Sequence, residues 1–193
     1  MPLITSHIEL IQKVKQGEVI SFATDTVAAF ACLPAFSGAI YQLKRRSWDK
    51  PLILLGANFT DFESYIAGTK EEQKIWQKMA QKYWPGPLTL ILPASDQLPS
   101  SIKAPSIGLR IPNHPDALNI LSQSGPLSST SANVSGDAPL TSMREIAQSF
   151  PSVFVLEQES TLASGVPSTI IMWIAAEGRW QMIRQGLLNI ITT

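Results

Sequence analysis

Apolar residues recur at helical spacing in several segments of the chain, and each segment begins at a residue that favours a helix N-terminus. The residues Ile8, Ile11 and Val14 follow Ser6, and Gly17 supplies a stop signal. This pattern predicts a helix with the three apolar side chains buried. Further helices are predicted after Ser37, after the capping boxes of Thr69 with Glu72 and of Ser142 with Glu145, and after Asn113 or His114.

Short apolar runs between turn residues predict the strands. Residues 51–55 form a continuous apolar run, which is typical of a strand covered on both faces. Strands are predicted at residues 18–23, 51–55, 88–92, 106–111, 153–156 and 167–171, with a hairpin leading into 180–184. Because helices and strands alternate, we expect a protein of the α/β class.

The composition indicates one folded domain. A chain of 193 residues is expected to form a single domain over residues 1–193 and to bury roughly 70% of the surface that the unfolded chain exposes. Hydrophobic residues make up 45% and charged residues 16%, which excludes a disordered chain. The 15 basic residues balance 15 acidic residues, which argues against binding to nucleic acid through bulk charge.

The same sequence lacks several common signatures. Cys32 is the only cysteine, so a disulfide framework within the chain is excluded and a buried thiol is the favoured interpretation. No zinc spacing, Walker loop or dinucleotide fingerprint occurs. The N-terminus does not resemble a signal peptide, and no stretch of 18 apolar residues occurs. We therefore expect a soluble, cytoplasmic protein with no membrane segment.

The segment 126–136 concentrates polar, uncharged side chains after a short apolar start. We interpret Pro126 and Leu127 as the end of a strand, and the serines, threonine and asparagine that follow as a loop that binds phosphate, carboxylate or ribose. The alternative is a solvated serine-rich linker. The helix patterns on both sides favour a loop inside a domain.

A basic cluster follows the predicted helix after Ser37. Four cations occur within residues 44–50, directly before the apolar run. Lys44 could supply a point charge, Arg46 a planar fork and Lys50 a contact to a further oxygen of a polyphosphate. The alternative is structural, since the helix macrodipole favours cations at a helix C-terminus.

Polar side chains in or next to strands provide further candidates. Residues 24–26 place two hydroxyls and a carboxylate at the end of a predicted strand, where open α/β sheets bind ligands. Arg110 lies among apolar residues and needs a partner, which is either a structural ion pair or a bound carboxylate or bicarbonate. We interpret His114 as a helix-capping residue rather than a catalytic base.

These motifs follow one another in an order that resembles the YrdC/TsaC family, the threonylcarbamoyl-AMP synthases. The resemblance extends over about residues 17–186, which would be the core of the domain. It implies a single twisted mixed sheet flanked by helices, with a concave, positively charged cleft. The motifs are Thr-Asp-Thr (24–26), Lys-x-Arg (44–46), Trp-Pro-Gly-Pro-Leu-Thr (84–89), Gly-Leu-Arg-Ile-Pro (108–112), Ser-Thr-Ser-Ala-Asn-x-Ser-Gly (129–136), Pro-Ser-Thr-Ile (167–170) and Arg-x-Gly (184–186).

The resemblance implies synthesis of threonylcarbamoyl-AMP and pyrophosphate from L-threonine, bicarbonate and ATP. It assigns catalysis to Lys44 and Arg46. Mg²⁺ would be bound through the ATP phosphates, with no metal ligands from the protein and no protein nucleophile. The implied ATP-binding residues are Lys44, Arg46, Lys50, Ser106, Ser131, Asn133 and Arg184. The implied threonine and bicarbonate residues are Thr26, Arg110, Ser129 and Ser168.

Three functions stay open. The first is a synthase that supplies the modification of adenosine 37 in tRNA, with a threonylcarbamoyl-transferase complex as its partner by family analogy. The second is a divergent paralogue that binds nucleotide but uses another acceptor or acts in regulation. It is motivated by Ala28 and Ala29, where the family has tyrosine and glycine. The third is a module that binds tRNA or another structured RNA.

Overall fold

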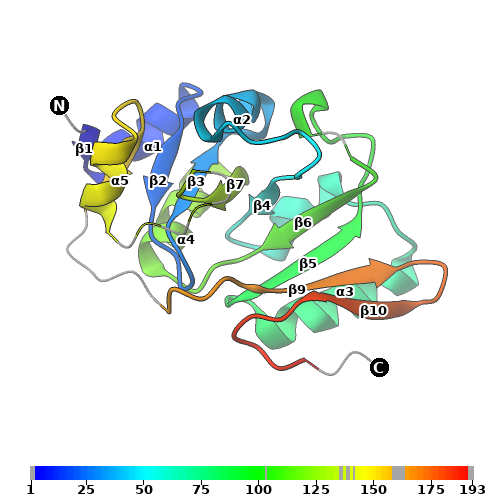
Figure 1. Ribbon diagram of the computed structural model, residues 1–193. Helices are drawn as coiled ribbons and strands as arrows, with labels where there is room; N and C mark the ends of the chain where they lie inside the picture. The colour runs from blue at the N-terminus through cyan, green and yellow to red at the C-terminus, as the bar shows by residue number, and fades with distance from the viewer. Residues whose placement is uncertain are drawn as a thin grey trace.

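The computed structural model describes residues 3–102, 104–134, 137, 140, 142–157 and 164–190 (Figure 1). The strands in these ranges are β1 (Leu3–Thr5), β2 (Ile20–Phe22), β3 (Ala29–Cys32), β4 (Ile53–Leu55), β5 (Leu88–Pro93), β6 (Ser106–Arg110), β7 (Leu127–Ser131), β8 (Phe154–Leu156), β9 (Thr169–Ile174) and β10 (Arg179–Arg184). The α-helices are α1 (His7–Lys15), α2 (Gly38–Lys44), α3 (Lys70–Tyr83), α4 (Pro115–Ser124) and α5 (Met143–Ser149). Three short 3₁₀ helices are η1 (Pro34–Phe36), η2 (Phe59–Tyr65) and η3 (Ser100–Ile102).

The described strands form one mixed sheet in the order β1-β8-β2-β3-β7-β4-β6-β5-β9-β10. β8 pairs in parallel with β1 and β2, β4 with β6, and β5 with β9, whereas the remaining neighbours are antiparallel. The predicted α/β class and the single twisted mixed sheet flanked by helices are confirmed (Figure 1).

Two apolar clusters lie on opposite faces of β3. Phe30 and Cys32 belong to the cluster that includes residues of α2, α3 and α5, and Ala29 and Ala31 belong to the one that includes α1 and α4. Neighbouring residues of a strand point to opposite faces, so helices cover both sides of the sheet here. Cys32 is buried as predicted, and burial raises the pKa of its thiol to about 12.

The predicted helix starts are largely confirmed. Ser6 caps α1 by accepting from the Glu9 amide, and both predicted capping boxes form at α3 and α5. Two details were wrong. Ile8 is 73% exposed because Leu10, rather than Ile8, faces the core with Ile11 and Val14. Ser37 occupies the N-cap position of α2 as predicted, but its hydroxyl does not cap the helix, because it donates to the Pro34 carbonyl oxygen at 2.8 Å.

Segment 126–136 differs most from its prediction. Residues 127–131 form β7, an inner strand between β3 and β4, instead of a loop after a strand end. The hydroxyls do not compete with the sheet, because the backbone of β7 pairs with strands on both sides. Positions 135 and 136 lie outside the described residues. The strands β1 and β3 were also missed, since both are short and lack alternation of polar and apolar residues.

His114 occupies the N-cap position of α4, but its side chain makes no capping hydrogen bond, so the predicted capping role was wrong in that respect. Pro115 begins the helix as predicted. None of the described helices combines the length and the apolar character needed to cross a bilayer.

Candidate functional site

A cavity of about 280 Å³ lies on one face of the sheet. The helices α1 and α4 pack against another part of the same face. Ala29 of β3, Ser129 and Ser131 of β7, and Ile53 and Leu55 of β4 all line it. The register pairs Ala29 with Ser131 and Ile53 with Ser129, so these side chains project from one face. The side chains of Ala29, Ser129 and Ser131 are small, so they leave space for the cavity above this face of the sheet.

Gly108 of β6 contributes to the same hollow. It pairs with Ile53 of β4, and a Cβ atom added at Gly108 would lie 2.7 Å from the Ile53 Cγ2 atom and 3.4 Å from the Thr89 Cγ2 atom. A side chain at position 108 would therefore clash with residues that line the cavity. Glycine is required here by space rather than by backbone conformation.

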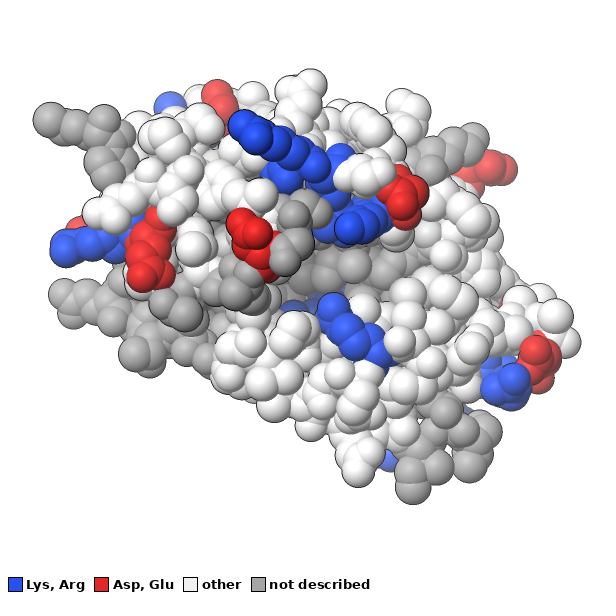
Figure 2. Space-filling view, viewed as in Figure 1, with Lys and Arg blue, Asp and Glu red and all other residues white. Residues whose placement is uncertain are grey.

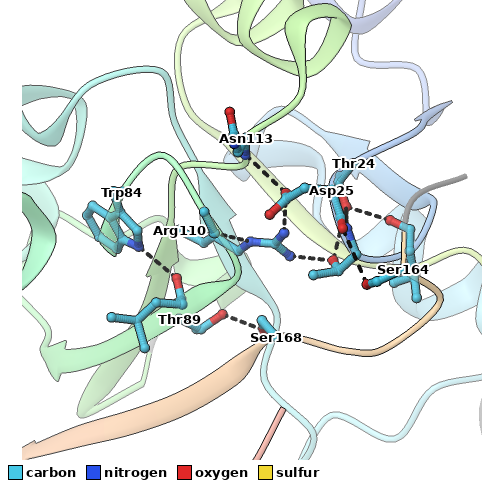
Figure 3. Close-up of polar contacts among 12 residues, drawn as sticks. Thr24, Asp25, Trp84, Thr89, Arg110, Asn113, Ser164 and Ser168 are labelled. Carbon is cyan, nitrogen blue, oxygen red and sulfur yellow. Dashed lines mark hydrogen bonds and ion pairs between the residues drawn. The ribbon is translucent and has the colours of Figure 1, made fainter. Parts of the chain in front are cut away.

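Arg110, at the end of β6, is 5% exposed and lines the cavity. Its Nε donates to the Gly86 carbonyl oxygen at 3.1 Å, Nη1 to the Thr26 hydroxyl at 2.7 Å, and Nη2 to the Asp25 carboxylate at 2.5 Å (Figure 3). Burial lowers the pKa of the guanidinium, and the charge of Asp25 opposes that effect. Arg110 has the structural ion pair that sequence analysis offered as one alternative, and it also faces the cavity.

The Thr-Asp-Thr segment forms a small network beside Arg110. The Thr24 hydroxyl donates to the Val27 carbonyl oxygen at 2.7 Å, and its oxygen lies 3.1 Å from the Thr26 hydroxyl. Since Thr24 has a single proton, Thr26 must donate to Thr24 while it accepts from Arg110. The Asp25 carbonyl oxygen accepts from the Ser164 hydroxyl at 3.4 Å (Figure 3). The network fixes the direction of the buried hydroxyls.

Ser168 and Arg184 line another part of the same cavity. The Ser168 hydroxyl is 2.8 Å from the Thr89 hydroxyl, and both side chains are buried and line the cavity. Arg184, at the end of β10, places Nε 3.1 Å and Nη2 2.9 Å from the Ser168 carbonyl oxygen. The end of β10 is thereby fixed to the segment that precedes β9.

Lys44, at the end of α2, is 1% exposed and does not line the cavity. Its ammonium donates to the Ser131 carbonyl oxygen and, at 3.0 Å, to the Asn133 amide oxygen. The Ser131 hydroxyl also donates to that amide oxygen at 2.6 Å. Burial, together with the nearby charge of Arg46, lowers the pKa of Lys44 to about 7.

The rest of the basic cluster divides between cavity and solvent. Arg46 lines the cavity and donates to the carbonyl oxygens of Lys50 and Pro51 at 2.9 and 3.0 Å, whereas Lys50 is exposed. In Figure 2, Lys and Arg side chains gather over α2 and the segment after it, where this face of the molecule is hollowed. Burial lowers the pKa of Arg46. None of the described Asp and Glu residues lines the cavity, so the described lining favours an anionic ligand.

The structure brings most of the predicted site residues together around this one cavity. The predicted residues that line it are Thr26, Arg46, Arg110, Ser129, Ser131, Ser168 and Arg184. The predicted residues that do not line it are Lys44, Lys50, Ser106 and Asn133. Ser106 begins β6 and lies on the same face of the strand as Gly108 and Arg110. It pairs with Pro93 at the end of β6 farther from Arg110.

Three further lining residues, Thr24, Thr89 and Thr130, lie in motifs that the sequence analysis identified, but they were not assigned to the ATP or threonine site. The available signal was their place in these motifs, since the hydroxyls of Thr24 and Thr130 had already been named as candidate ligand-binding groups. The Arg110 partner Asp25 was noticed in its motif but not placed in the site. The described residues contain no cluster of His, Cys, Asp and Glu able to hold a metal ion.

Comparisons with known proteins match nearly the whole chain. A family model for Sua5, YciO and YrdC, described as telomere recombination, matches residues 12–186. A protein of Yersinia pestis (strain Pestoides F) named threonylcarbamoyl-AMP synthase is 34% identical over 155 residues, which cover 77% of this chain and 81% of that protein. A Yersinia pseudotuberculosis (serotype O:1b) protein of the same name matches equally well.

Solved structures have the same fold. The P. abyssi Sua5 structure complexed with L-threonine is 29% identical, with a TM-score of 0.82. The match covers 93% of this chain but 53% of that one, so this chain spans about half the length of that Sua5. E. coli YciO, at 20% identity and a TM-score of 0.79, is covered over 90% of its length and shows the likeness of fold alone.

Proposed function

This chain belongs to the Sua5/YciO/YrdC family, and from that membership we propose that it synthesises threonylcarbamoyl-AMP from L-threonine, bicarbonate and ATP, with release of pyrophosphate. The observation that carries the proposal is the cavity on which Arg46, Arg110 and Arg184 converge among hydroxyl groups, with no carboxylate among the described residues of its lining. Such a lining suits substrates that are all anionic or carry a carboxylate.

The reaction requires no protein nucleophile. The amine of threonine and bicarbonate combine into a carbamate with loss of water. A carbamate oxygen then attacks the α-phosphorus of ATP, and the bond to the bridging oxygen breaks so that pyrophosphate leaves. Negative charge accumulates on phosphate oxygens as this bond breaks, so fixed cations and positioning can provide most of the acceleration.

The nucleotide would occupy the side of the cavity nearest α2. There Arg46 would hold phosphate oxygens, and Arg184 and Ser131, which line the same cavity, would provide further contacts. Lys44 donates to the Ser131 carbonyl oxygen, so its ammonium lies directly behind the cavity wall. Lys50, Ser106 and Asn133 would complete the site from outside the present lining.

Threonine and bicarbonate would bind beside Arg110. The guanidinium offers a fork for a carboxylate, and Thr26, Ser129 and Ser168 provide hydroxyls that line the same cavity. The L-threonine complex of the Sua5 relative supports threonine as the amino acid. Ala28 and Ala29 also line the cavity, so the departures from the family motif fall inside the proposed site.

Mg²⁺ would be carried by the ATP phosphates. The described residues offer no cluster of acidic side chains to hold it, and a nucleotide-bound ion needs few protein ligands. The product would serve the modification of adenosine 37 in tRNA, passed on by a transferase complex in the cytoplasm.

Pyrophosphate release by the purified protein tests this proposal. The protein is incubated with ATP, Mg²⁺ and bicarbonate, and reactions with L-threonine, with L-serine and without an amino acid are compared. Mass spectrometry of the nucleotide product identifies threonylcarbamoyl-AMP. We expect release that requires both threonine and bicarbonate. ATP binding without threonine-dependent release would overturn the synthase and favour the nucleotide-binding paralogue, for which Ala28 and Ala29 supply the motive.

A further inference from the structure

The Arg110 guanidinium is fixed from two directions by separate segments of the chain. Gly86, in the turn after α3, accepts from Nε, while Asp25 and Thr26 accept from the two terminal nitrogens. Each terminal nitrogen carries two N–H groups. One of them on each nitrogen therefore has no acceptor among the described residues, and Arg110 lines the cavity.

Asp25 holds Arg110 without lining the cavity. Its Oδ1 atom also accepts from the backbone amide of Asn113 at 3.0 Å, so the carboxylate is itself fixed to the segment before α4 (Figure 3). The Asp25 side chain is 15% exposed and that of Arg110 is 6% exposed. An ion pair shielded from solvent to this degree restrains orientation more strongly than a surface pair does.

A second cation makes this restraint necessary. The charge of Arg184 lowers the pKa of Arg110, in addition to the larger effect of burial, whereas Asp25 raises it. Among the described residues, Asp25 provides the acidic partner of Arg110. Without it, a buried guanidinium would be left uncompensated beside another cation and would gain by turning toward solvent.

We propose that Asp25 is a positioning residue, which holds the Arg110 guanidinium so that its remaining N–H groups meet the carboxylate or carbamate of the amino-acid substrate. The inference rests on the proposed function. It assigns Asp25 to threonine recognition, since among the described residues the Asp25 carboxylate accepts from Arg110 and the Asn113 backbone amide, whereas Arg46 donates to the Lys50 and Pro51 carbonyl oxygens.

Two substitutions separate the geometry from the charge. Asp25→Ala removes both. Asp25→Asn removes the charge but keeps an acceptor oxygen at the position of Oδ1. The side-chain NH₂ group then replaces Oδ2, which has no hydrogen-bond partner among the described residues. Asp61→Ala is the matched control, because the Asp61 carboxylate accepts from the backbone amides of Ala57 and Asn58 away from the cavity.

Kinetics of pyrophosphate release provide the first readout. For Asp25→Ala we expect the KM for threonine to rise about 10- to 100-fold while the KM for ATP changes less than about twofold. Asp25→Asn should recover part of this loss. Asp61→Ala should lower the melting temperature and leave both KM values unchanged. An unchanged threonine KM in Asp25→Ala would overturn the inference, as would an equal rise in both KM values.

A readout without turnover keeps this inference distinct from the proposed function. In ¹⁵N NMR spectra, the Arg110 guanidinium protons of the wild type should exchange slowly with water and rotate slowly, because three acceptors hold them. In Asp25→Ala they should exchange fast. If the wild type showed no synthase activity but its Arg110 protons exchanged more slowly than those of Asp25→Ala, the proposed function would be refuted. The role of Asp25 in positioning Arg110 would still be supported. Equal exchange in both proteins would refute the positioning role.

Discussion

The Lys44 ammonium lies 3.0 Å from the Asn133 amide oxygen, and this contact joins the end of α2 to the turn after β7. Both oxygens that accept from Lys44 have a second donor. The Asn133 side-chain oxygen accepts from the Ser131 hydroxyl, and the Ser131 carbonyl oxygen accepts from the Asn133 backbone N–H at 3.0 Å. Both acceptors would therefore keep a hydrogen bond if the Lys44 ammonium were absent. Because burying a charge costs free energy, we infer that Lys44 is retained for function rather than for stability.

Removing this ammonium is expected to impair function rather than stability. Lys44→Met keeps the apolar stem, removes the buried charge and leaves each acceptor with its other donor. We expect a melting temperature at pH 6.5 equal to or above that of the wild type and ATP affinity weakened about 10-fold or more. Calorimetric titration with ATP and thermal unfolding check both. A marked loss of stability would assign Lys44 a structural role instead.

The lowered pKa of Lys44 predicts how stability depends on pH. The value falls from 10.5 to about 7 on folding, so above pH 7 the unfolded chain binds more protons than the folded one. The free energy of unfolding should then rise with pH above pH 7, by at most about 1.4 kcal/mol per pH unit, and Lys44 should contribute no pH dependence below pH 7. Denaturation at pH 6 to 9 measures this. In Lys44→Met the rise should be absent, and an equal slope in both proteins would contradict the assignment.

Features of the fold that depend on residues close together in the sequence could be predicted from the sequence alone. The capping boxes of Thr69 and Ser142 were predicted correctly, because each joins residues three positions apart. The order of the motifs indicated the family, and with it the fold. Most of the residues that the resemblance assigned to the site line the cavity.

Contacts between distant segments could not be predicted in this way. The partner of Arg110 lies 85 positions away at Asp25, and one partner of Lys44 lies 89 positions away at Asn133. The strand β7 was missed because its hydroxyls resemble a loop, although its pairing with β3 and β4 decides its conformation. The polar residues of β7 are buried because the strand pairs with β3 and β4. The spacing of apolar residues along the sequence does not reveal this pairing between distant strands.

Arg46 and Arg45 provide a matched test of the basic cluster. Arg46 lines the cavity and its hydrogen bonds stay within its own segment, whereas Arg45 is exposed and does not line the cavity. Arg46→Ala should weaken ATP binding about 10-fold or more and shift the melting temperature by less than about 4 °C. Arg45→Asn removes the neighbouring charge, and asparagine tolerates the φ of 49° at this position.

Titration with ATP at two salt concentrations compares the two variants. Arg45→Asn should bind ATP like the wild type at moderate salt, because an exposed charge outside the cavity is screened. Equal loss of affinity in both variants would show that total charge, rather than the position of Arg46 in the cavity, governs nucleotide binding.

Adjacent serines of β7 offer the most direct test of which face of the strand is functional. Ser129 lines the cavity, whereas Ser128 points to the opposite face, where its buried hydroxyl has no hydrogen-bond partner among the described residues. Ser128→Ala removes a hydroxyl that gains nothing from burial, so the free energy of unfolding should stay equal or rise by up to about 1 kcal/mol, with activity unchanged. Ser129→Ala should lower kcat/KM for threonine about 10-fold, with little change in stability. Pyrophosphate release and denaturation of the two variants distinguish the faces, since the reverse pattern would place the substrate on the Ser128 side of the sheet.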